Sequence, residues 1–413
     1  MNLNMEGSTY IGELQGKPKQ KENLLALILS VRQLKKVFGR VYLNFGEPIL
    51  LDQRLDVLLP GWRDNPCVLD SPAFIPASQQ LGLDISRHIN AAADVNASNL
   101  LALALLSTPR HAIDEDELAA HLDVCKALLL AVPYSDRVTV TELDGRGMIA
   151  CGEQLKILQR RSHPFGDLIY LHEEEGVLMT YFRNSTLHLF ALPSLLAVIL
   201  LQRREASLQQ IRHRVHAVYP FLQAELFLIW PIDQLDAVVA NYLEALVGLG
   251  LIERRRNGNW TVPAASSAEH ARLHILSRAL RQTLVRYHMT ITVLSQRGSG
   301  TLTQQQLEEL CHLLAQRLSF VREFSAPEFF DKALFRGFLD TLKGMGFLHL
   351  DARDQLVFDT RLARLAEEAL EVLPSGIRQA VLQVTQVTDE EVAEALRRVD
   401  KKGKGGKDLS ALN

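Results

Sequence analysis

Three lysines near the N-terminus have the type and spacing to bind a phosphate group. Lys17, Lys19 and Lys21 alternate with other residues in the run GKPKQK. Ammonium groups donate hydrogen bonds to phosphate oxygens, so this run could contact a substrate phosphate or a lipid head group. It could equally be an exposed turn before a helix, which is favoured because short basic runs are usually solvated. These lysines are the only substrate-binding candidates that we name.

Two pairs of histidine and acidic residues have the types found in metal sites. His163 precedes Asp167 by four residues, and His172 stands next to three glutamates. A zinc site needs three or four converging ligands, and neither pair shows such a set, so we expect solvated surface and no metal. The four cysteines are far apart and form no CxxC pair, which favours neither a zinc site nor a disulfide framework. No cofactor is predicted.

Two further motifs have both a binding and a structural interpretation. In NFGEPI, Gly46 and Pro48 set a bend, and we expect Phe45 and Ile49 to face a core. The run Arg254, Arg255 and Arg256 could touch nucleic acid or anionic lipid. Because no second basic element lies nearby in the sequence, a solvated loop is the favoured interpretation of this run.

The elements that must position these residues are mostly helical. Apolar spacing predicts a helix over 21–38, and alternation predicts a strand over 41–51. Further expectations are a connector at 61–76, and helices within 79–106 that are interrupted near 95–98. We also expect one small hairpin or sheet from 138–142 and 168–182, with an acidic turn at 173–176.

Two segments resemble each other at an offset of 96 residues. They are LEALVGLGLIERRRNGNWTV, which starts at Leu243, and LDTLKGMGFLHLDARDQLVF, which starts at Leu339. Each predicts a helix that ends at Gly-x-Gly, an apolar pair, and two strands joined by a polar turn, which is the outline of a winged-helix unit. We expect the apolar pairs to be buried. The lysine-rich and glycine-rich tail after a short helix at 388 is expected to be mobile.

Composition and targeting signals are consistent with a cytoplasmic protein. The net charge is −3 over 413 residues, so no overall basic field draws in nucleic acid. No signal peptide is recognised at the N-terminus. The most apolar stretch, 187–201, has only 15 residues and includes Pro193, whereas a spanning helix needs about 20. We therefore expect a buried helix or a corner between strand and helix, and no transmembrane helix.

Several ordered blocks resemble bacterial glycerol-3-phosphate acyltransferases of the PlsB type. They are STYIGELQGKPKQKENLL, GRVYLNFGEPILL, INAAADVNASNLLALALLS, MTYFRNSTLHLFALPSLLA, YPFLQAELFL and APEFFDKALF. The resemblance covers about nine tenths of the chain. FGEP alone is shared by many acyltransferases, whereas the ordered series of long blocks is specific.

The resemblance implies transfer of a fatty acyl group from acyl-CoA or acyl carrier protein to glycerol 3-phosphate, at the cytoplasmic face of the inner membrane. In this family a histidine, held by an aspartate five residues later, acts as the general base. Those blocks lie upstream of STYIGELQG in the family, and we find no counterpart here, so no catalytic residue is assigned. His111 and Asp116 have this spacing, but their neighbours differ, and DEDEL is typical of the first turn of a helix.

The predicted fold class is α+β and mainly α, with the end of an α/β acyltransferase domain followed by a large helical region with winged-helix-like units. The predicted divisions are 1–60, 61–265 with a small sheet and the first unit, 266–387 with the second unit, and 388–413. We expect 1–60 to be the least stable part, because its helix and strand need other strands to cover them.

Two functions compete. The first is a C-terminal acyltransferase fragment that is inactive alone, pairs with a separate N-terminal acyltransferase fragment and contacts inner-membrane lipids peripherally. The alternative is a free-standing winged-helix-like interaction or nucleic-acid-binding protein. The low net charge gives the alternative no electrostatic support, and no nucleic-acid partner is predicted.

Overall fold

The computed structural model describes residues 40–65, 71–322, 327–362, 364–365, 372–388, 390–392, 394 and 397. The predicted helix at 21–38, the tail beyond 400, and Lys17, Lys19 and Lys21 lie outside these residues. The described part is mainly helical with short strands, as the predicted fold class requires.

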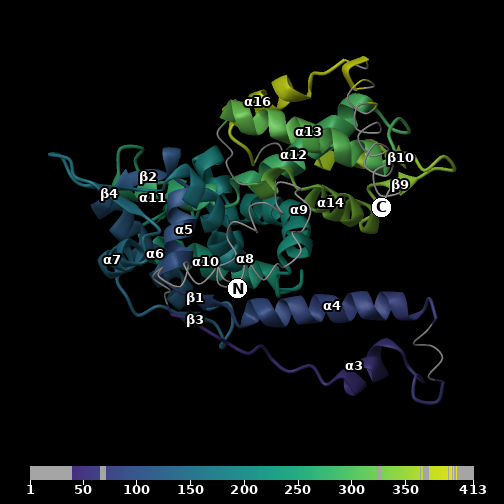
Figure 1. The fold of residues 1–413 in the computed structure, drawn as a ribbon, viewed down its shortest axis with the longest axis horizontal. Coiled ribbons are helices and arrows are strands. Elements are labelled where there is room, and N and C mark those ends of the chain that lie inside the picture. Colours follow the sequence, from purple (N-terminus) through teal and green to yellow (C-terminus); the bar gives the residue numbers. More distant parts are fainter. Residues whose placement is uncertain are drawn as a thin grey trace, which may run out of the picture.

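The first described segment is an arm that lies apart from the other helices (Figure 1). Residues 40–50 are extended, and α3 (Leu51–Leu58) and α4 (Phe74–Ala91) follow. The two helices share a small apolar cluster around Leu55 and Ala77, separate from the main core. An ion pair of 2.6 Å between Arg54 and Asp84 also joins them.

The prediction of a strand over 41–51 is wrong. Residues 41–50 form no β-ladder, and Leu51 begins α3. The placement of Phe45 in a core is also wrong, because its side chain is 76% exposed. Alternating apolar residues favour an extended chain, but a strand also needs a neighbouring strand, and none lies beside this segment within the described residues.

When β3 (Thr139–Val140), which lies between α6 and α7, and the 3₁₀ turns are set aside, the body contains three units with the same order of elements: helix, strand, helix, helix, strand, strand. The first unit comprises α5 (Ala97–Leu106), β2 (Ala112–Asp114), α6 (Glu115–Ala131), α7 (Gly145–Gln154), β4 (Gln159–Arg161) and β5 (Leu168–Tyr170). The second comprises α8 (Glu173–Arg203), β6 (Glu205–Ala206), α9 (Leu208–Leu226), α10 (Leu235–Gly248), β7 (Glu253–Arg254) and β8 (Trp260–Thr261). The third comprises α12 (Arg281–Arg297), a bridge residue Thr303, α13 (Gln304–Arg322), α14 (Lys332–Gly344), β9 (His349–Leu350) and β10 (Leu356–Val357).

The strand order is also the same in the three units. The first two sheets have the orders β2-β5-β4 and β6-β8-β7, so the last strand lies in the middle. In the third unit β10 pairs with β9, and Thr303 bridges to Gln355 immediately before β10. Sequence comparison found only the second and third units. The winged-helix interpretation of these units stays a prediction.

The first unit was missed by the sequence comparison because Gln154 and Lys156 stand where the other two units have the glycines of Gly-x-Gly. After α10 and α14 the chain turns through Gly250 (φ 71°) and Gly346 (φ 74°), each two residues after the helix ends. The equivalent position after α7 is Lys156, with φ 60°. An apolar pair follows all three positions, and the predicted burial of the two later pairs is confirmed for Leu251, Ile252 and Leu348, at 1% exposure each. The Gly-x-Gly signature is therefore absent from the first unit although its turn is kept.

Helix α8 forms the centre of the body and packs against α5, α9, α10 and α11 (Ala268–Arg278). The apolar stretch 187–201 lies within α8 and is buried, as the buried-helix alternative predicted. By length and composition alone, Leu178–Arg203 could also cross a membrane, but 83% of its most apolar window is buried inside the protein.

Two further expectations for this region need correction. Residues 173–176 belong to the start of α8 and do not form a turn between strands. The segments 138–142 and 168–182 do not share a sheet. Within the first, β3 (Thr139–Val140) pairs in parallel with β1 (Asp94–Val95), while β5 pairs with β2 and β4. The interruption predicted near 95–98 is confirmed by β1 and the start of α5.

The third unit joins the second through a buried polar and aromatic contact. The guanidinium of Arg286 pairs with Glu225, whose other oxygen accepts a hydrogen bond of 2.9 Å from the Tyr287 hydroxyl. The Tyr287 ring stacks on Phe338 at 4.4 Å between centroids. Short elements complete the described fold: two 3₁₀ turns (Pro109–His111 and Pro327–Phe330) and α16 (Ser375–Thr385), which packs on α12 and α13.

Candidate functional site

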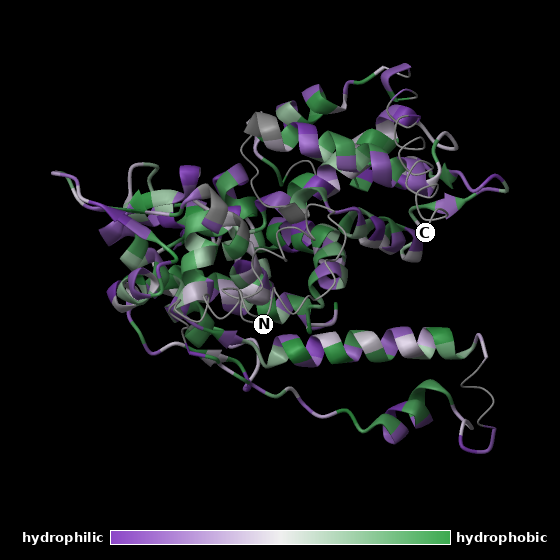
Figure 2. Ribbon diagram, in the orientation of Figure 1, coloured by the Kyte–Doolittle hydropathy of each residue, from purple (hydrophilic) through white to green (hydrophobic). Residues whose placement is uncertain are grey.

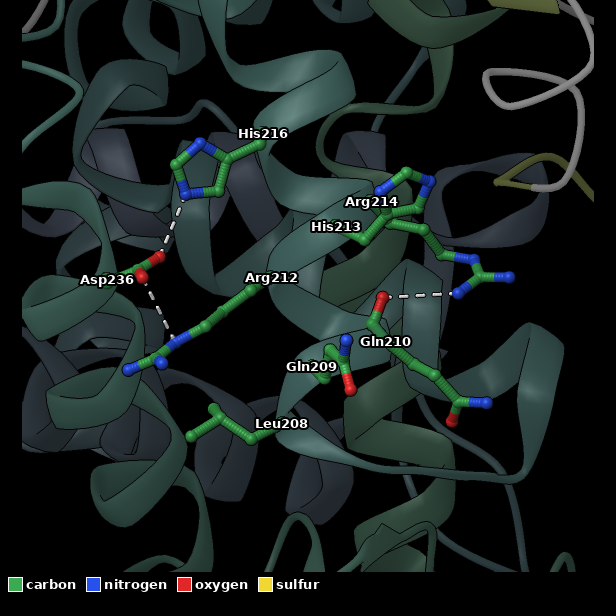
Figure 3. Close-up of a pocket in the computed structure, with 8 residues that line it drawn as sticks. All are labelled: Leu208, Gln209, Gln210, Arg212, His213, Arg214, His216 and Asp236. Atoms are coloured by element: carbon green, nitrogen blue, oxygen red, sulfur yellow. Dashed lines mark hydrogen bonds and ion pairs between the residues drawn. The ribbon is translucent and has the colours of Figure 1, made fainter.

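An open pocket of about 700 Å³ lies at the start of α9, next to the first turn of α10 (Figure 3). Basic and imidazole side chains dominate its lining. The lining residues are Leu208, Gln209, Gln210, Arg212, His213, Arg214, His216 and Asp236. We refer to this pocket as the α9 pocket.

Local sequence signals position the start of α9. Ser207 caps the helix, since its hydroxyl accepts a hydrogen bond of 3.3 Å from the Gln210 amide. The Gln210 side chain in return accepts one of 3.0 Å from the Ser207 amide, which completes a capping box. Arg212 and His216 are four residues apart and therefore share a helix face.

The shared face of α9 meets one carboxylate of α10. His216 Nε2 lies 2.8 Å from Asp236 Oδ1, and Arg212 Nε lies 3.4 Å from Asp236 Oδ2. All three side chains are between 36% and 44% exposed, so solvent reaches the cluster. Asp236 lies in the first turn of α10, where a negative charge is stabilised by the helix dipole.

The remaining basic side chains lie around the same helix turn (Figure 3). Arg214 is 8% exposed, and its Nη1 donates a hydrogen bond of 3.1 Å to the Gln210 carbonyl oxygen. His213 is exposed at the pocket surface. The Arg212 guanidinium, with its side chain 36% exposed, places a positive charge that solvent reaches next to the Asp236 carboxylate. The chemistry that this lining can perform is the binding of an anion.

A second candidate surface is the arm, which contacts of Asn44 and Glu47 hold against the body. Asn44 Nδ2 donates a hydrogen bond of 2.8 Å to Thr139 Oγ1, and Glu47 pairs with Arg137. His88 Nδ1 lies 2.6 Å from the Glu47 carbonyl oxygen. At Gly46 a Cβ atom would lie 2.6 Å from the His88 carbonyl oxygen, so only glycine permits this approach.

The apolar side chains of the arm point into solvent. Val41 is 89% exposed, Leu43 74% and Ile89 of α4 65%. Figure 2 shows hydrophobic stretches along both the extended segment and α4. Exposed apolar patches of this kind mark surfaces that contact another molecule.

His111 and Asp116, which were considered as a pair from the sequence, contact different groups in the structure. His111 Nδ1 lies 3.4 Å from the Leu105 carbonyl oxygen, whereas Asp116 pairs with Arg146 in the first turn of α6, as the helix-start interpretation predicted. The Asp167 carboxylate pairs with Arg160 at 3.0 Å, and this contact keeps the Asp167 pKa below its usual value. Within the described residues no cluster of three His, Cys, Asp or Glu is placed to hold a metal.

The arginine run of the second unit lies on an exposed loop. Arg254 pairs with Glu244 at 3.2 Å and lies over the Trp260 ring. Helix α10, which precedes the loop, contains no lysine or arginine. In α14 the cations Lys332, Arg336 and Lys343 each pair with a carboxylate. The nucleic-acid-binding alternative is therefore not favoured.

Sequence reasoning missed the α9 pocket. A signal was present in RHRVH (212–216), on a helix that Ser207 caps. Its two arginines and two histidines lie within one and a half helical turns of one another. Asp236 lies twenty residues after His216, and only the packing of α10 beside α9 shows that the two meet.

The sequence of residues 10–351 matches a family model described as the glycerol-3-phosphate acyltransferase C-terminal region. A protein named glycerol-3-phosphate acyltransferase from Pseudomonas paraeruginosa is 43% identical over 394 residues, which cover 95% of this chain and 47% of that protein. The protein of the same name from Pseudomonas fluorescens Pf-5 is 43% identical over 398 residues, with the same coverage. The one from Pseudomonas putida KT2440 is 44% identical over 392 residues, covering 94% and 47%. The chain thus spans about half the length of these relatives.

Proposed function

Since the chain belongs to the glycerol-3-phosphate acyltransferase family, we propose that it supplies the C-terminal half of such an enzyme. The reaction is transfer of a fatty acyl group from acyl-CoA or acyl carrier protein to glycerol 3-phosphate. In this proposal the catalytic histidine and the residues that bind the substrate phosphate belong to an N-terminal half. On this proposal the chain alone does not turn over, because the histidine that removes the hydroxyl proton belongs to the other half.

The observation that carries this proposal is the arrangement of the arm. Its polar groups are held by Thr139, Arg137 and His88, while Val41, Leu43 and Phe45 are left in solvent. Each large apolar side chain of this strip that becomes covered contributes about 1.5–3 kcal/mol. We propose that the N-terminal catalytic half covers this strip.

The length of the relatives supports this choice of partner. The matched proteins are about twice as long as this chain, and the family match begins at residue 10. The N-terminal half of a relative is therefore a polypeptide of defined sequence that can be produced and mixed with this chain.

Complementation tests the proposal. The full chain is mixed with the N-terminal half of the Pseudomonas putida relative, and acyl transfer to labelled glycerol 3-phosphate is measured with both donors. The relative's own C-terminal half serves as the positive control. We expect no turnover from either half alone, turnover from the mixture, and at least a tenfold loss with Phe45→Asp.

A matched variant separates docking from a general effect of an added charge. Phe165 is 92% exposed on the loop between β4 and β5, outside the arm. Phe165→Asp should leave complementation unchanged. Turnover by the chain alone, or full complementation by the Phe45→Asp variant, would contradict the proposal.

We also propose a peripheral position at the cytoplasmic face of the inner membrane. The support for this location is the family resemblance. Flotation of the complemented pair with phospholipid vesicles tests it, and a pair that stays with the soluble fraction would argue against it.

A further inference from the structure

We propose that the α9 pocket binds a phosphate group, with Arg212 as its principal ligand and Asp236 as a built-in competitor. The ligand class is a phosphate monoester or diester. This site lies on the second unit, away from the arm, and the proposal does not depend on acyl transfer by this chain.

Arg212 has free hydrogen-bonding capacity directed to the pocket. Within the described part of the chain, its guanidinium makes a single contact, between Nε and Asp236 at 3.4 Å. A guanidinium carries five N–H donors in a planar fork that fits two phosphate oxygens. The two Nη groups are therefore available to a ligand. Figure 3 shows them on the side of the guanidinium that faces away from the Asp236 carboxylate.

The two carboxylate oxygens of Asp236 contact different partners. One oxygen lies 2.8 Å from His216 Nε2 and the other faces Arg212. This arrangement holds both side chains in place while no ligand is bound. It also places a negative charge beside the incoming phosphate, so the carboxylate should weaken phosphate binding.

The rest of the lining favours an anion over a cation or an apolar ligand. Gln209 and Gln210 are neutral polar residues of the lining. Among the described lining residues, Asp236 is the only carboxylate. The pocket is open, so its volume of about 700 Å³ leaves room for a phosphate attached to a larger molecule.

The direct test is a calorimetric titration of the full chain with inorganic phosphate at low salt. Arg212→Gln should weaken binding at least tenfold, because it removes a charge-assisted bidentate contact. Asp236→Asn should strengthen binding by about three- to tenfold, because it removes the competing charge. The opposite signs of these two effects are not expected from a general loss of structure.

Two further variants control for charge and folding. Arg353→Gln removes an equally positive, exposed side chain from the loop of the third unit and should leave binding unchanged. His213→Ala changes an exposed residue of the pocket and should weaken binding two- to threefold without a change in the melting curve. Equal affinity in the wild type, Arg212→Gln and Arg353→Gln would overturn the proposal, and so would weaker binding in a folded Asp236→Asn variant.

The natural source of the phosphate is resolved by parallel titrations. Coenzyme A, glycerol 3-phosphate and vesicles that contain an anionic phospholipid each present the same chemistry. Of these three, the natural ligand is the one that binds the wild type most tightly and loses the most affinity in Arg212→Gln. Because these titrations use binding alone, they succeed or fail independently of the complementation experiment.

Discussion

The arm and α8 are both rich in apolar residues, but these residues are buried in α8 and largely exposed in the arm. Phe190 of α8 is fully buried, whereas Phe45 of the arm is 76% exposed. Helix α8 packs against four helices of this chain, while the apolar residues of α3 and α4 form a small cluster of their own, and α4 reaches the body through Asn90. An apolar residue stabilises a fold only where other residues cover it. The body is therefore complete in itself, and the arm is suited to be covered by another molecule.

Hydrogen exchange should show the largest difference between these regions. Amides of residues 41–45 make no β-ladder, whereas those of 195–200 lie within a buried helix. Local opening free energies range from near zero at exposed segments to the global value in a core. We expect protection factors at least about a thousandfold higher in α8. Full protection of residues 41–45 in a monomer would show that the arm is already covered.

The next largest difference is expected in the free energy of unfolding when one phenylalanine in each region is replaced by alanine. Phe190→Ala should lower the free energy of unfolding by about 3–5 kcal/mol, because it leaves a cavity in the core. Phe45→Ala should change it by less than about 0.5 kcal/mol, as for other exposed positions. Denaturant titration of the two variants measures both values. A cost for Phe45→Ala close to that of Phe190→Ala would remove the distinction drawn here.

Acid should destabilise the body through its buried histidines. Burial lowers the pKa of His188 to about 4, and a hydrogen bond to the Asn90 carbonyl oxygen only partly offsets this effect. Burial also lowers the pKa of His121 to about 4. Unfolded histidine takes up its proton near pH 6.5, so the folded state is favoured fully above that pH. This contribution, up to about 3 kcal/mol per histidine, is lost as the pH falls from 6.5 towards 4.

The pH dependence can be assigned to one side chain. The free energy of unfolding, measured between pH 7 and pH 4, should fall less steeply for His188→Gln than for the wild type. An unchanged slope in His188→Gln would show that His188 does not contribute to acid destabilisation.

Substitutions in the turns that end α7 and α14 should change the free energy of unfolding the least. Gly346→Ala places a side chain at φ 74° where an added Cβ meets nothing within 4 Å, so its cost of about 1–2 kcal/mol reports backbone strain alone. Lys156→Gly should relieve similar strain and raise the free energy of unfolding by about 0.5–1 kcal/mol. Thermal or denaturant melts of both variants test this. A loss of stability in Lys156→Gly would mean that the first unit is not equivalent to the other two at this turn.

Much of the local structure could be predicted from residue patterns. The Gly-x-Gly turns, the buried apolar pairs after them, the acidic start of α6 and the buried apolar stretch of α8 depend on nearest neighbours and periodicity, which a sequence displays directly. The ordered blocks also identified the family. Each of these features is encoded within a window of about twenty residues.

Other features depend on contacts between residues far apart in the chain. Phe45 has the pattern of a core residue, and its exposure depends on which segments lie beside it. The equivalence of Lys156 to two glycines emerged only when the three sheets could be compared. The α9 pocket exists because Asp236 packs against Arg212 and His216 from the next helix. Burial and ion pairing are properties of neighbours in space, so a pattern of residue types along the chain could not reveal them.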